Sequence, residues 1–249
     1  MTDVLLSAQN ISRRFRGLTA LDQVSLSLAR GTVHAVIGTN GAGKSTLVSV
    51  LAGELAPNEG SIFLHRQEVT SWSQPRRARA GLGRSYQRST IFPSLTVHEN
   101  CRLAAQAGHQ AFWNWAAPAS RCRYSNEAAD QAISLVGLEP DVLQLAGLLS
   151  HGRKRQLEIA MSLATRPSVL LLDEPLAGMG PEETERMLDL LASLKAEHAV
   201  LLIEHDMDAV FKVADEITVM VNGKVIAHGQ PQAIRDNPDV QTAYLGDGE

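Results

Sequence analysis

The sequence predicts an α/β fold, and three observations predict it. An apolar stretch at residues 33–37 is followed by a glycine-rich loop and a helix pattern over 38–53. Two further short stretches, 169–172 and 200–203, are entirely apolar, as strands buried on both faces are. An amphipathic helix pattern that begins at Pro181 separates these two stretches. Strands that alternate with helices in this way favour an α/β architecture.

The glycine-rich loop reads GTNGAGKS over residues 38–45, which matches the phosphate-binding P-loop motif between a strand and a helix. Glycines allow successive backbone N–H groups to turn inward, and these groups form an anion site together with the helix N-terminus. Lys44 is expected to reach the β- and γ-phosphates, and the Ser45 hydroxyl is expected to bind Mg²⁺. The residues predicted to contact the nucleotide here are Gly38, Asn40, Gly41, Ala42, Gly43, Lys44, Ser45 and Thr46.

Composition limits the class of protein. The 249 residues suffice for one large domain, or for a domain with a subdomain. A net charge of −4 argues against a dedicated nucleic-acid binder. Cys101 and Cys122 lack the spacing of a disulfide framework or a metal site, which predicts free thiols in a reducing compartment. Without a secretory signal or an apolar run of about 18 residues, we expect a soluble protein that works at a membrane only through a partner.

The first part of the chain predicts strands with alternating faces at 5–8 and 24–28, and a short strand at 62–64. Phe15 lies between the first two of these strands and could stack on a purine base, although ordinary core packing is the alternative. Pro75 then begins a short arginine-rich helix that ends near Gly81. Because the chain is acidic overall, we interpret its arginines as a solvated helix face.

The pattern changes between residues 89 and 149, where we predict an inserted helical subdomain. Gln87 stands just before it, at the end of an extended segment, where its amide could ligate Mg²⁺ or hold a water. Thr96 and Glu99 fit a capping box at the start of the first inserted helix. Trp113 and Trp115 would either dock a partner or pack onto their own helices.

Ser150 begins another helix, which continues through Ala164. Its hydroxyl has helix N-cap character, and Gly152 leaves the first turn open. The helix start offers free N–H groups and about half a positive charge, so a second phosphate site is one interpretation and a plain capped helix is the other.

Three polar residues follow buried strands. Asp173 and Glu174 end the strand at 169–172, and neighbouring strand residues point to opposite faces, so the two carboxylates should have different roles. Asp173 suits the Mg²⁺ shell, usually through water, and Glu174 suits polarising the attacking water. His205 follows the strand at 200–203, at the edge where open α/β sheets bind ligands, and could contact a γ-phosphate and the attacking water.

The chain ends with a predicted hairpin at 217–226, which carries an Asn-Gly turn, and with short helices after Pro231 and Pro238. The order of all these features resembles the ATP-binding subunit of ABC transporters over essentially the whole chain. The resemblance implies that Phe15 stacks on adenine, that Gln87 is the Q-loop residue and that residues 150–156 are the signature motif.

The resemblance also implies that Glu174 is the catalytic base and His205 the switch histidine. It further implies one ABC cassette over residues 1–249, with a P-loop NTPase core and an N-terminal antiparallel β subdomain. In this division, 1–87 and 161–249 form the RecA-like and β core. Residues 88–160 form the inserted α-helical subdomain that ends in the signature.

Within this family, four stretches of the sequence are similar to the importer ATPases for branched-chain amino acids and for urea or short amides. They are the stretches at 153–160, 174–179, 203–207 and 237–246. The lipopolysaccharide-export ATPase has a similar tail but lacks an insert like the Trp113/Trp115 stretch, so we favour import. Soluble ABC proteins of translation or DNA repair usually carry two cassettes or a long coiled coil. A GTPase or small-molecule kinase is disfavoured because the guanine motif Asn-Lys-x-Asp is missing and Ser150-x-Gly152 is present.

The resemblance implies ATP and Mg²⁺ as ligands and a head-to-tail dimer, either of identical chains or with a related ATPase. Further implied partners are transmembrane permease subunits and, indirectly, a periplasmic or extracellular solute-binding protein, with no nucleic acid. The chain would then lie at the cytoplasmic face of the membrane. It departs from the family pattern where His151 and Arg153 replace the usual Gly and Gln of the signature, and where Gly180 replaces the D-loop aspartate. These departures predict altered communication across the dimer or a weakened site.

Overall fold

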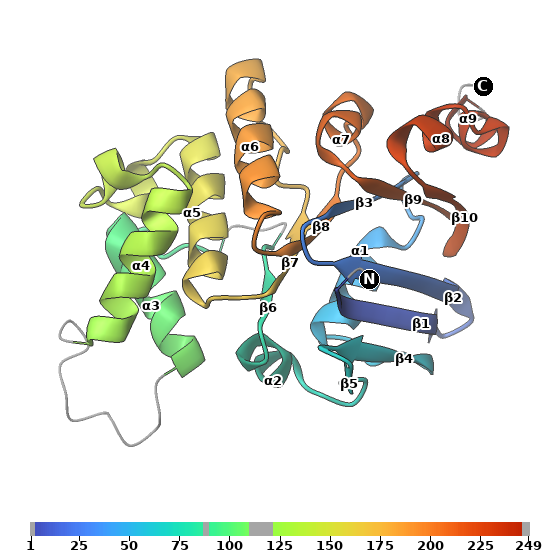
Figure 1. The fold of residues 1–249 in the computed structure, drawn as a ribbon, viewed down its shortest axis with the longest axis horizontal. Helices are drawn as coiled ribbons and strands as arrows, with labels where there is room; N and C mark the ends of the chain where they lie inside the picture. The colour runs from blue at the N-terminus through green and yellow to red at the C-terminus, as the bar shows by residue number, and fades with distance from the viewer. Residues whose placement is uncertain (1–2, 87–89, 110–121, 246–249) are drawn as a thin grey trace.

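A six-stranded sheet forms the centre of the molecule in the computed structural model, which describes residues 3–86, 90–109 and 122–245 (Figure 1). The strand order is β10-β9-β3-β8-β7-β6, and every neighbouring pair is parallel except β9 and β10. The strands are β3 Val33–Gly38, β6 Leu82–Arg84, β7 Val169–Asp173, β8 Ala199–Ile203, β9 Glu216–Val221 and β10 Lys224–Gly229. The predicted α/β fold is confirmed.

The register of the central strands brings their carboxyl ends to one edge. Val36 of β3 pairs with Ile203 of β8, and Asp173 of β7 pairs with the same Ile203. The P-loop follows β3, Glu174 follows β7 and His205 lies just beyond β8, so all three leave the sheet at this edge.

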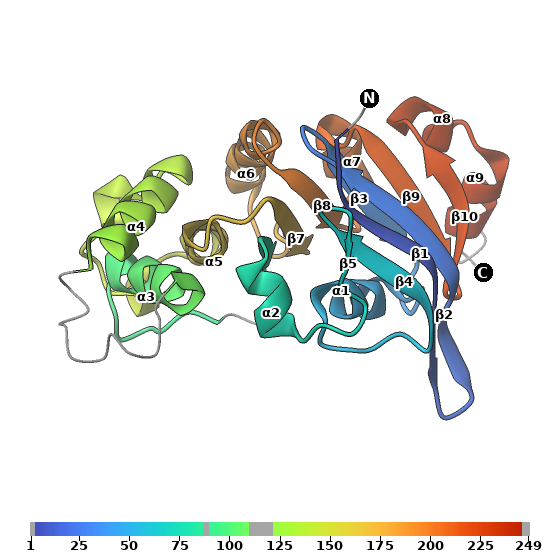
Figure 2. The same ribbon diagram turned by 60° about the horizontal axis from the view of Figure 1, so that its bottom comes forward.

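A second, antiparallel sheet has the order β2-β1-β4-β5, as predicted for the N-terminal part. Its strands are β1 Val4–Phe15, β2 Leu18–Ala29, β4 Glu59–Leu64 and β5 Gln67–Glu68. Helix α1, Lys44–Ala52, lies between the two sheets (Figure 2). Its Leu47 and Leu51 are fully buried in a core that also contains side chains of both sheets. The helix that follows the P-loop is therefore held from both sides.

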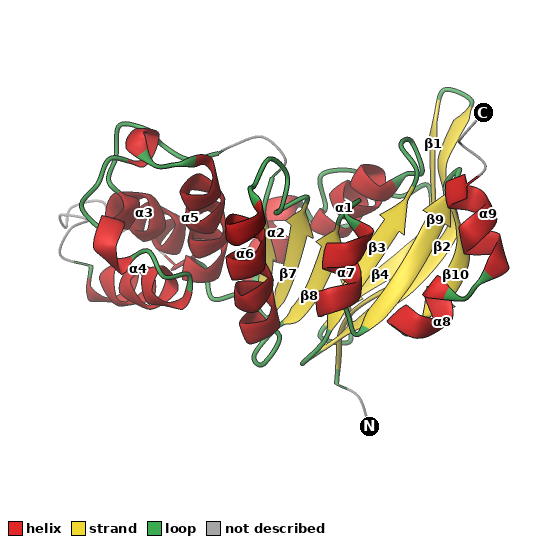
Figure 3. Ribbon diagram, turned by 90° about the horizontal axis from the view of Figure 1, so that it is seen from above, coloured by secondary structure: helices red, strands yellow, loops and turns green. Residues whose placement is uncertain are grey.

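The opposite face of the central sheet is covered by helices (Figure 3). They are α6 Pro181–Leu194, α7 Met207–Val213, α8 Pro231–Arg235 and α9 Pro238–Leu245. The apolar stripe predicted for α6 is buried at Met187, Leu190, Leu191 and Leu194. The predicted Asn-Gly hairpin is confirmed, since β9 and β10 are joined by Asn222 and Gly223 with φ of 48° and 78°.

The predicted inserted helices lie beside this core as α3 Val97–His109, α4 Arg123–Leu135 and α5 His151–Ala164, with 3₁₀ turns at Glu139–Asp141 and Ala146–Leu148. The capping box is confirmed. The Thr96 N–H donates to Glu99 Oε2 over 2.9 Å, and the Glu99 N–H donates to Thr96 Oγ1 over 3.1 Å. The boundary predicted at residue 160 falls inside α5. Trp113 and Trp115 lie outside the described residues.

The arginine-rich helix is α2, Gln74–Arg79, and one prediction about it is wrong. Arg76 and Arg79 are exposed, but Arg77 is 1% exposed and donates to the carbonyls of Val50 and Leu51 over 2.8 and 2.7 Å. These carbonyls belong to the last turn of α1, where the helix has no i+4 N–H groups left to offer, and a guanidinium can bind two of them at once. The Val50 carbonyl also accepts from the Gly53 N–H over 3.2 Å. Burial lowers the pKa of Arg77 to about 10.

In the described part of the chain, no helix has both the length and the apolar character needed to cross a bilayer.

Candidate functional site

A cleft of about 510 Å³ opens at the carboxyl edge of the sheet, over the P-loop. It is lined by the loop and the start of α1, by Glu174, by the beginning of β2 and by the hairpin residue Asn222. Of the residues predicted to bind nucleotide, the cleft brings together Phe15, Asn40, Gly41, Ala42, Gly43, Lys44, Ser45 and Thr46. This one cleft therefore unites residues that are far apart in the sequence.

Two glycines of the loop have no room for a side chain. A Cβ on Gly38 would lie 2.1 Å from the Met220 carbonyl oxygen, and one on Gly43 would lie 2.4 Å from the Ala20 carbonyl oxygen. Gly43 also has φ of 100°, which L side chains rarely adopt. The neighbouring sheets thus approach the loop so closely that only glycine fits.

The start of α1 is suited to an anion. Gly43 is its N-cap and supplies no side-chain cap to the first turn. Lys44 Nζ donates to the carbonyl oxygens of Gly38 and Thr39 over 2.6 and 3.0 Å, which holds the ammonium over the loop. Burial lowers the pKa of Lys44, while the charges of Glu174 and Asp173 oppose that shift.

Phe15 ends β1 at the rim of the cleft and is 38% exposed. The Arg13 guanidinium lies 4.7 Å from the centroid of its ring. The ring is therefore a rim residue rather than part of the core, which leaves it accessible for stacking on a base.

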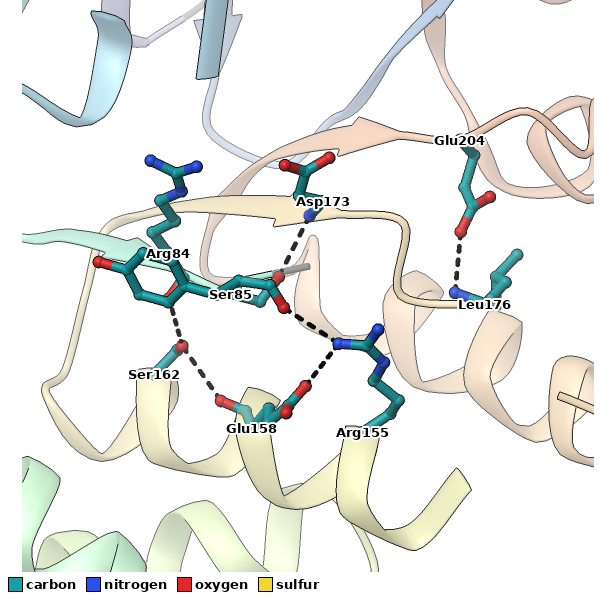
Figure 4. A network of polar contacts seen from close by, with 9 residues as sticks. Arg84, Ser85, Arg155, Glu158, Ser162, Asp173, Leu176 and Glu204 are labelled. Atoms are coloured by element: carbon teal, nitrogen blue, oxygen red, sulfur yellow. Dashed lines mark hydrogen bonds and ion pairs between the residues drawn. The ribbon is translucent and has the colours of Figure 1, made fainter. Parts of the chain in front are cut away.

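Asp173 ends β7 and is 3% exposed. Its N–H donates to Ser85 Oγ over 3.1 Å, and the Ser85 N–H donates to the Leu171 carbonyl over 2.9 Å (Figure 4). Burial raises the pKa of the Asp173 carboxyl, and among the nearby charges Arg84 opposes this shift most strongly. Within the described residues, Asp173 Oδ1 is buried and has no hydrogen-bond partner.

A buried carboxylate oxygen without a protein partner fits a divalent cation, because Mg²⁺ prefers oxygen ligands and takes only one or two from the protein. Ser45, the second predicted ligand, lines the cleft, whereas Asp173 is not among the residues that line it. Gln87, the third predicted ligand, lies outside the described residues. Among the described side chains, no group of three or more His, Cys, Asp or Glu is placed to hold a metal ion.

Glu174 follows Asp173 and lines the cleft. Its φ of 50° is unusual for a residue other than glycine, and its N–H donates to the Ile203 carbonyl over 2.9 Å. A left-handed backbone at a non-glycine position costs about 1 kcal/mol or more and is concentrated at functional sites. Glu174 lies one residue beyond β7, so its left-handed backbone, rather than strand alternation, directs its side chain; Glu174 lines the cleft, and Asp173 is not among the lining residues.

His205 leaves the same edge after β8 but does not line the cleft, and its side chain is 66% exposed. Beside it, Glu204 is buried and accepts from the N–H groups of Leu176 and His205 over 2.8 and 3.2 Å. Burial raises the pKa of the Glu204 carboxyl, and these two N–H donors oppose the shift. Glu204 therefore ties the segment after Glu174 to the segment that carries His205.

Ser150 and Gly152 lie on α5, away from the P-loop cleft of their own chain. Ser150 is exposed, and its Oγ accepts from the Arg153 N–H over 3.3 Å, so the predicted N-cap is confirmed. It also donates to Glu183 Oε1 over 3.4 Å. A Cβ on Gly152 would lie 2.6 Å from the Glu183 carboxylate, so this carboxylate covers the first turn of α5.

The structure also shows the surroundings of the three residues that depart from the usual family pattern. A Cβ on Gly178 would lie 2.9 Å from His151 Nε2, so the imidazole packs on the segment that precedes α6. Arg153 Nη1 donates to the Gly137 carbonyl over 2.7 Å and so points toward the end of α4. Gly180 is the N-cap of α6 and supplies no side-chain cap.

Sequence reasoning missed Ser85, Glu183 and Glu204, along with a buried ion pair between Arg155 and Glu158 on α5. Only Glu204 had a signal, because it is an acid directly after an entirely apolar strand. The others depend on segments that meet only in the folded chain.

Comparison with known proteins places these features in context. Residues 21–177 match the family model described as ABC transporter, and residues 224–249 match the model described as branched-chain amino acid ATP-binding cassette transporter. The chain is 40% identical to the high-affinity branched-chain amino acid transport ATP-binding protein BraF of Pseudomonas aeruginosa, over 99% of this chain and 100% of that one. It is 38% identical to LivG of Escherichia coli, a protein of the same description, over 99% and 100% of the two chains.

Two solved structures are also similar. A nucleotide-free ATP-binding cassette from an ABC transporter superposes with a TM-score of 0.87 at 29% identity, covering 98% of this chain and 99% of that one. The ADP conformation of an ATP-binding cassette of an ABC transporter superposes with a TM-score of 0.88 at 30% identity, covering 98% and 100%.

Proposed function

The chain belongs to the ABC transporter family, and on that premise we propose that it is the ATP-hydrolysing subunit of an importer for branched-chain amino acids or a related small polar solute. One observation carries the proposal. Relatives described as branched-chain amino acid transport ATP-binding proteins match 99% of this chain at 38–40% identity. The match at residues 224–249 to a family of the same description favours import over the lipopolysaccharide-export and non-transport alternatives.

In this proposal, the cleft over the P-loop binds ATP. The first-turn N–H groups of α1 and the Lys44 ammonium would take the phosphates, and Phe15 would stack on the adenine. Hydrogen bonds to a charged group contribute about 1.5–3 kcal/mol each, so a few of them suffice for tight binding. The loop needs no rearrangement of its glycines, because the adjoining sheets already fix it.

We assign the Mg²⁺ site to Ser45, Asp173 and Gln87. When bound, Mg²⁺ neutralises charge on the β- and γ-phosphates. The buried Oδ1 of Asp173 supports this assignment.

Glu174 would orient the attacking water and accept its proton, and His205 would contact the γ-phosphate. The strained φ of Glu174 holds its carboxylate in the cleft, beside Lys44. Glu204 would position His205, since it holds the backbone N–H of that residue. Positioning and electrostatic stabilisation account for most of the catalysis in phosphoryl transfer.

Ser150 and Gly152 would contact the ATP of a second protomer in a head-to-tail dimer, of identical chains or with a related ATPase. Two features support this. The α5 start lies away from the P-loop cleft of its own chain, and Ser150 is exposed. Closing and opening of the dimer would move transmembrane permease subunits at the cytoplasmic face of the membrane, which receive solute from a periplasmic or extracellular binding protein.

A carboxylate-to-amide exchange tests the proposal. Glu174→Gln should lower ATP hydrolysis at least about 100-fold, since it removes the base that activates the water. It should also trap an ATP-bound dimer, detected by size-exclusion chromatography with light scattering at saturating Mg·ATP. Glu182→Gln is the matched control, because Glu182 is exposed on α6, and it should hydrolyse ATP at the wild-type rate.

A Glu174→Gln chain that stayed monomeric at saturating Mg·ATP would contradict the dimer. Co-purification with permease subunits, followed by identification of the ligand of the associated binding protein, tests the transported solute. A binding protein that took no branched-chain amino acid would overturn the substrate assignment and leave the ATPase assignment standing.

A further inference from the structure

The helix that begins at Ser150 carries a buried ion pair one turn further on. Arg155 Nη1 lies 2.8 Å from Glu158 Oε2, and the two side chains are only 10% and 4% exposed. Within the described residues, Glu158 Oε1 is buried without a hydrogen-bond partner. Replacing a buried ion pair by apolar residues is often neutral or stabilising, so stability alone does not account for this pair.

Helix α5 uses these residues to hold the short segment after β6 (Figure 4). Arg155 Nη1 also donates to the Tyr86 carbonyl over 3.0 Å. One turn beyond Glu158, Ser162 Oγ donates to the Arg84 carbonyl over 3.0 Å. The carbonyls of Arg84 and Tyr86, two residues apart, thus both accept hydrogen bonds from side chains of α5.

Ser85, which lies between these two carbonyls, points to the other side. Its Oγ accepts from the Asp173 N–H over 3.1 Å, and its N–H donates to the Leu171 carbonyl over 2.9 Å. The segment 84–86 therefore connects α5 to Asp173, whose buried Oδ1 has no hydrogen-bond partner within the described residues. Arg155 also contributes positive charge that favours the ionised form of Asp173.

We propose that Arg155 is a positioning residue for ATP hydrolysis. By holding the Tyr86 carbonyl, it fixes the segment 84–86 and, through Ser85, the backbone N–H of Asp173, from which the carboxylate extends. The helix whose first turn would take a second protomer's phosphate is then mechanically joined to the metal-binding edge of its own chain. The inference rests on the proposed function, because it concerns the Mg²⁺ site and the signature helix.

The test replaces both charges, so that no unpaired charge stays buried. The variant is Arg155→Met with Glu158→Met, and the probe is Mn²⁺ in the presence of excess ADP, with free Mn²⁺ measured by electron paramagnetic resonance. We expect Mn²⁺ affinity to fall about tenfold, as is usual when a residue supporting a metal ligand is lost. ADP affinity in EDTA should stay within about twofold of wild type, and kcat should fall while the KM for ATP does not.

The matched control is Arg123→Met with Glu127→Met, which removes an exposed i,i+4 ion pair on the neighbouring helix α4. It should leave Mn²⁺ affinity unchanged. Glu158→Gln should retain most of the affinity, because Arg155 can still donate to Tyr86. A Glu158→Gln variant that lost as much as the double variant would overturn the assignment to the Tyr86 contact.

If the double variant does not fold, Arg155→Lys gives the same comparison, and an intermediate loss of Mn²⁺ affinity is expected because lysine lacks the planar fork. Wild-type Mn²⁺ affinity in either variant, or an equal loss of metal-free ADP affinity, would overturn the inference. Wild-type protein that bound no Mn²⁺ with ADP would instead overturn the proposed function itself.

Discussion

Two helix N-termini in this molecule are candidates to bind phosphate, and they are prepared in opposite ways. The start of α1 has a glycine N-cap, no side-chain cap and a loop fixed by the carbonyls of Ala20 and Met220. The start of α5 is capped by Ser150, and its first turn is covered by the Glu183 carboxylate. The first is open to an anion, whereas groups of the same chain already occupy the second.

Because the two helix starts differ in this way, the two halves of an ATP site can bind phosphate at different times. Among the described residues, the side-chain contacts that a nucleotide would have to displace at the α1 site are those of Lys44 with the Gly38 and Thr39 carbonyls. At α5, a phosphate must compete with Glu183 for the same favourable end of the helix dipole. We therefore expect nucleotide to bind the P-loop first and the α5 start only when a second protomer closes.

The largest expected effect is a loss of nucleotide affinity when the glycine loop before α1 is altered. Gly43→Ala should weaken nucleotide binding about 100-fold or more, since its Cβ would meet the Ala20 carbonyl and its φ of 100° disfavours alanine. Titration with a fluorescent ATP analogue measures this, and circular dichroism checks that the variant is folded. Gly41→Ala is the control, because its φ is also positive but nothing lies within 4 Å, and it should lose no more than about tenfold. Equal losses would show that the close approach of β2 is unimportant.

The next prediction concerns the pH dependence of stability, which His34 on β3 should control; β3 is the strand that leads into the P-loop. His34 is buried and its Nε2 lies 2.8 Å from Thr218 Oγ1, and burial, together with His228, lowers its pKa to about 4. The unfolded chain therefore binds a proton between pH 6.5 and 4 that the folded chain excludes. Stability should be complete above pH 6.5 and fall by about 3 kcal/mol as the pH drops toward 4.

Urea unfolding at a series of pH values measures this loss. His34→Gln should flatten the slope between pH 6.5 and 4, because glutamine has no proton to gain. A slope of the same size in the variant would assign the acid sensitivity to other groups.

The smallest expected change concerns the Glu183 carboxylate at the start of α5. In the Glu174→Gln background, Glu183→Gln should let the dimer form at about two- to fivefold lower Mg·ATP, since it removes a charge that competes with phosphate for the helix start. Light scattering across an ATP titration measures the midpoint. Glu182→Gln removes the same charge from the adjacent exposed residue and should leave the midpoint unchanged. A midpoint that rose in Glu183→Gln would mean that this carboxylate assists closure.

The features predicted correctly from the sequence are short and continuous. The P-loop, the Thr96 capping box, the Ser150 N-cap and the Asn-Gly hairpin each depend on residues within a few positions of one another. Backbone dihedral preferences and local hydrogen bonds fix such motifs wherever they occur. The same locality explains why the α/β class could be predicted from apolar stretches alone.

The error at Arg77 shows the limit of this reasoning. Net charge and helix pattern favoured a solvated arginine, but the side chain lies against the last turn of α1, whose residues stand 26 and 27 positions earlier. No local pattern encodes that α2 crosses the end of α1. The partner of a buried charge is decided by which segments the sheets bring together.

The sequence alone was enough to predict where phosphate would bind, because the P-loop motif places its proposed anion site within eight consecutive residues. The contacts around the two proposed phosphate sites arise only in the folded chain: the Ser85 contact to Asp173, the Arg155 contact to Tyr86 and the Glu183 carboxylate that covers the first turn of α5. Each of these contacts joins segments 31 to 88 positions apart. Such contacts arise from the strand order β3-β8-β7-β6 and the packing of α5 and α6, which no single stretch of the chain specifies.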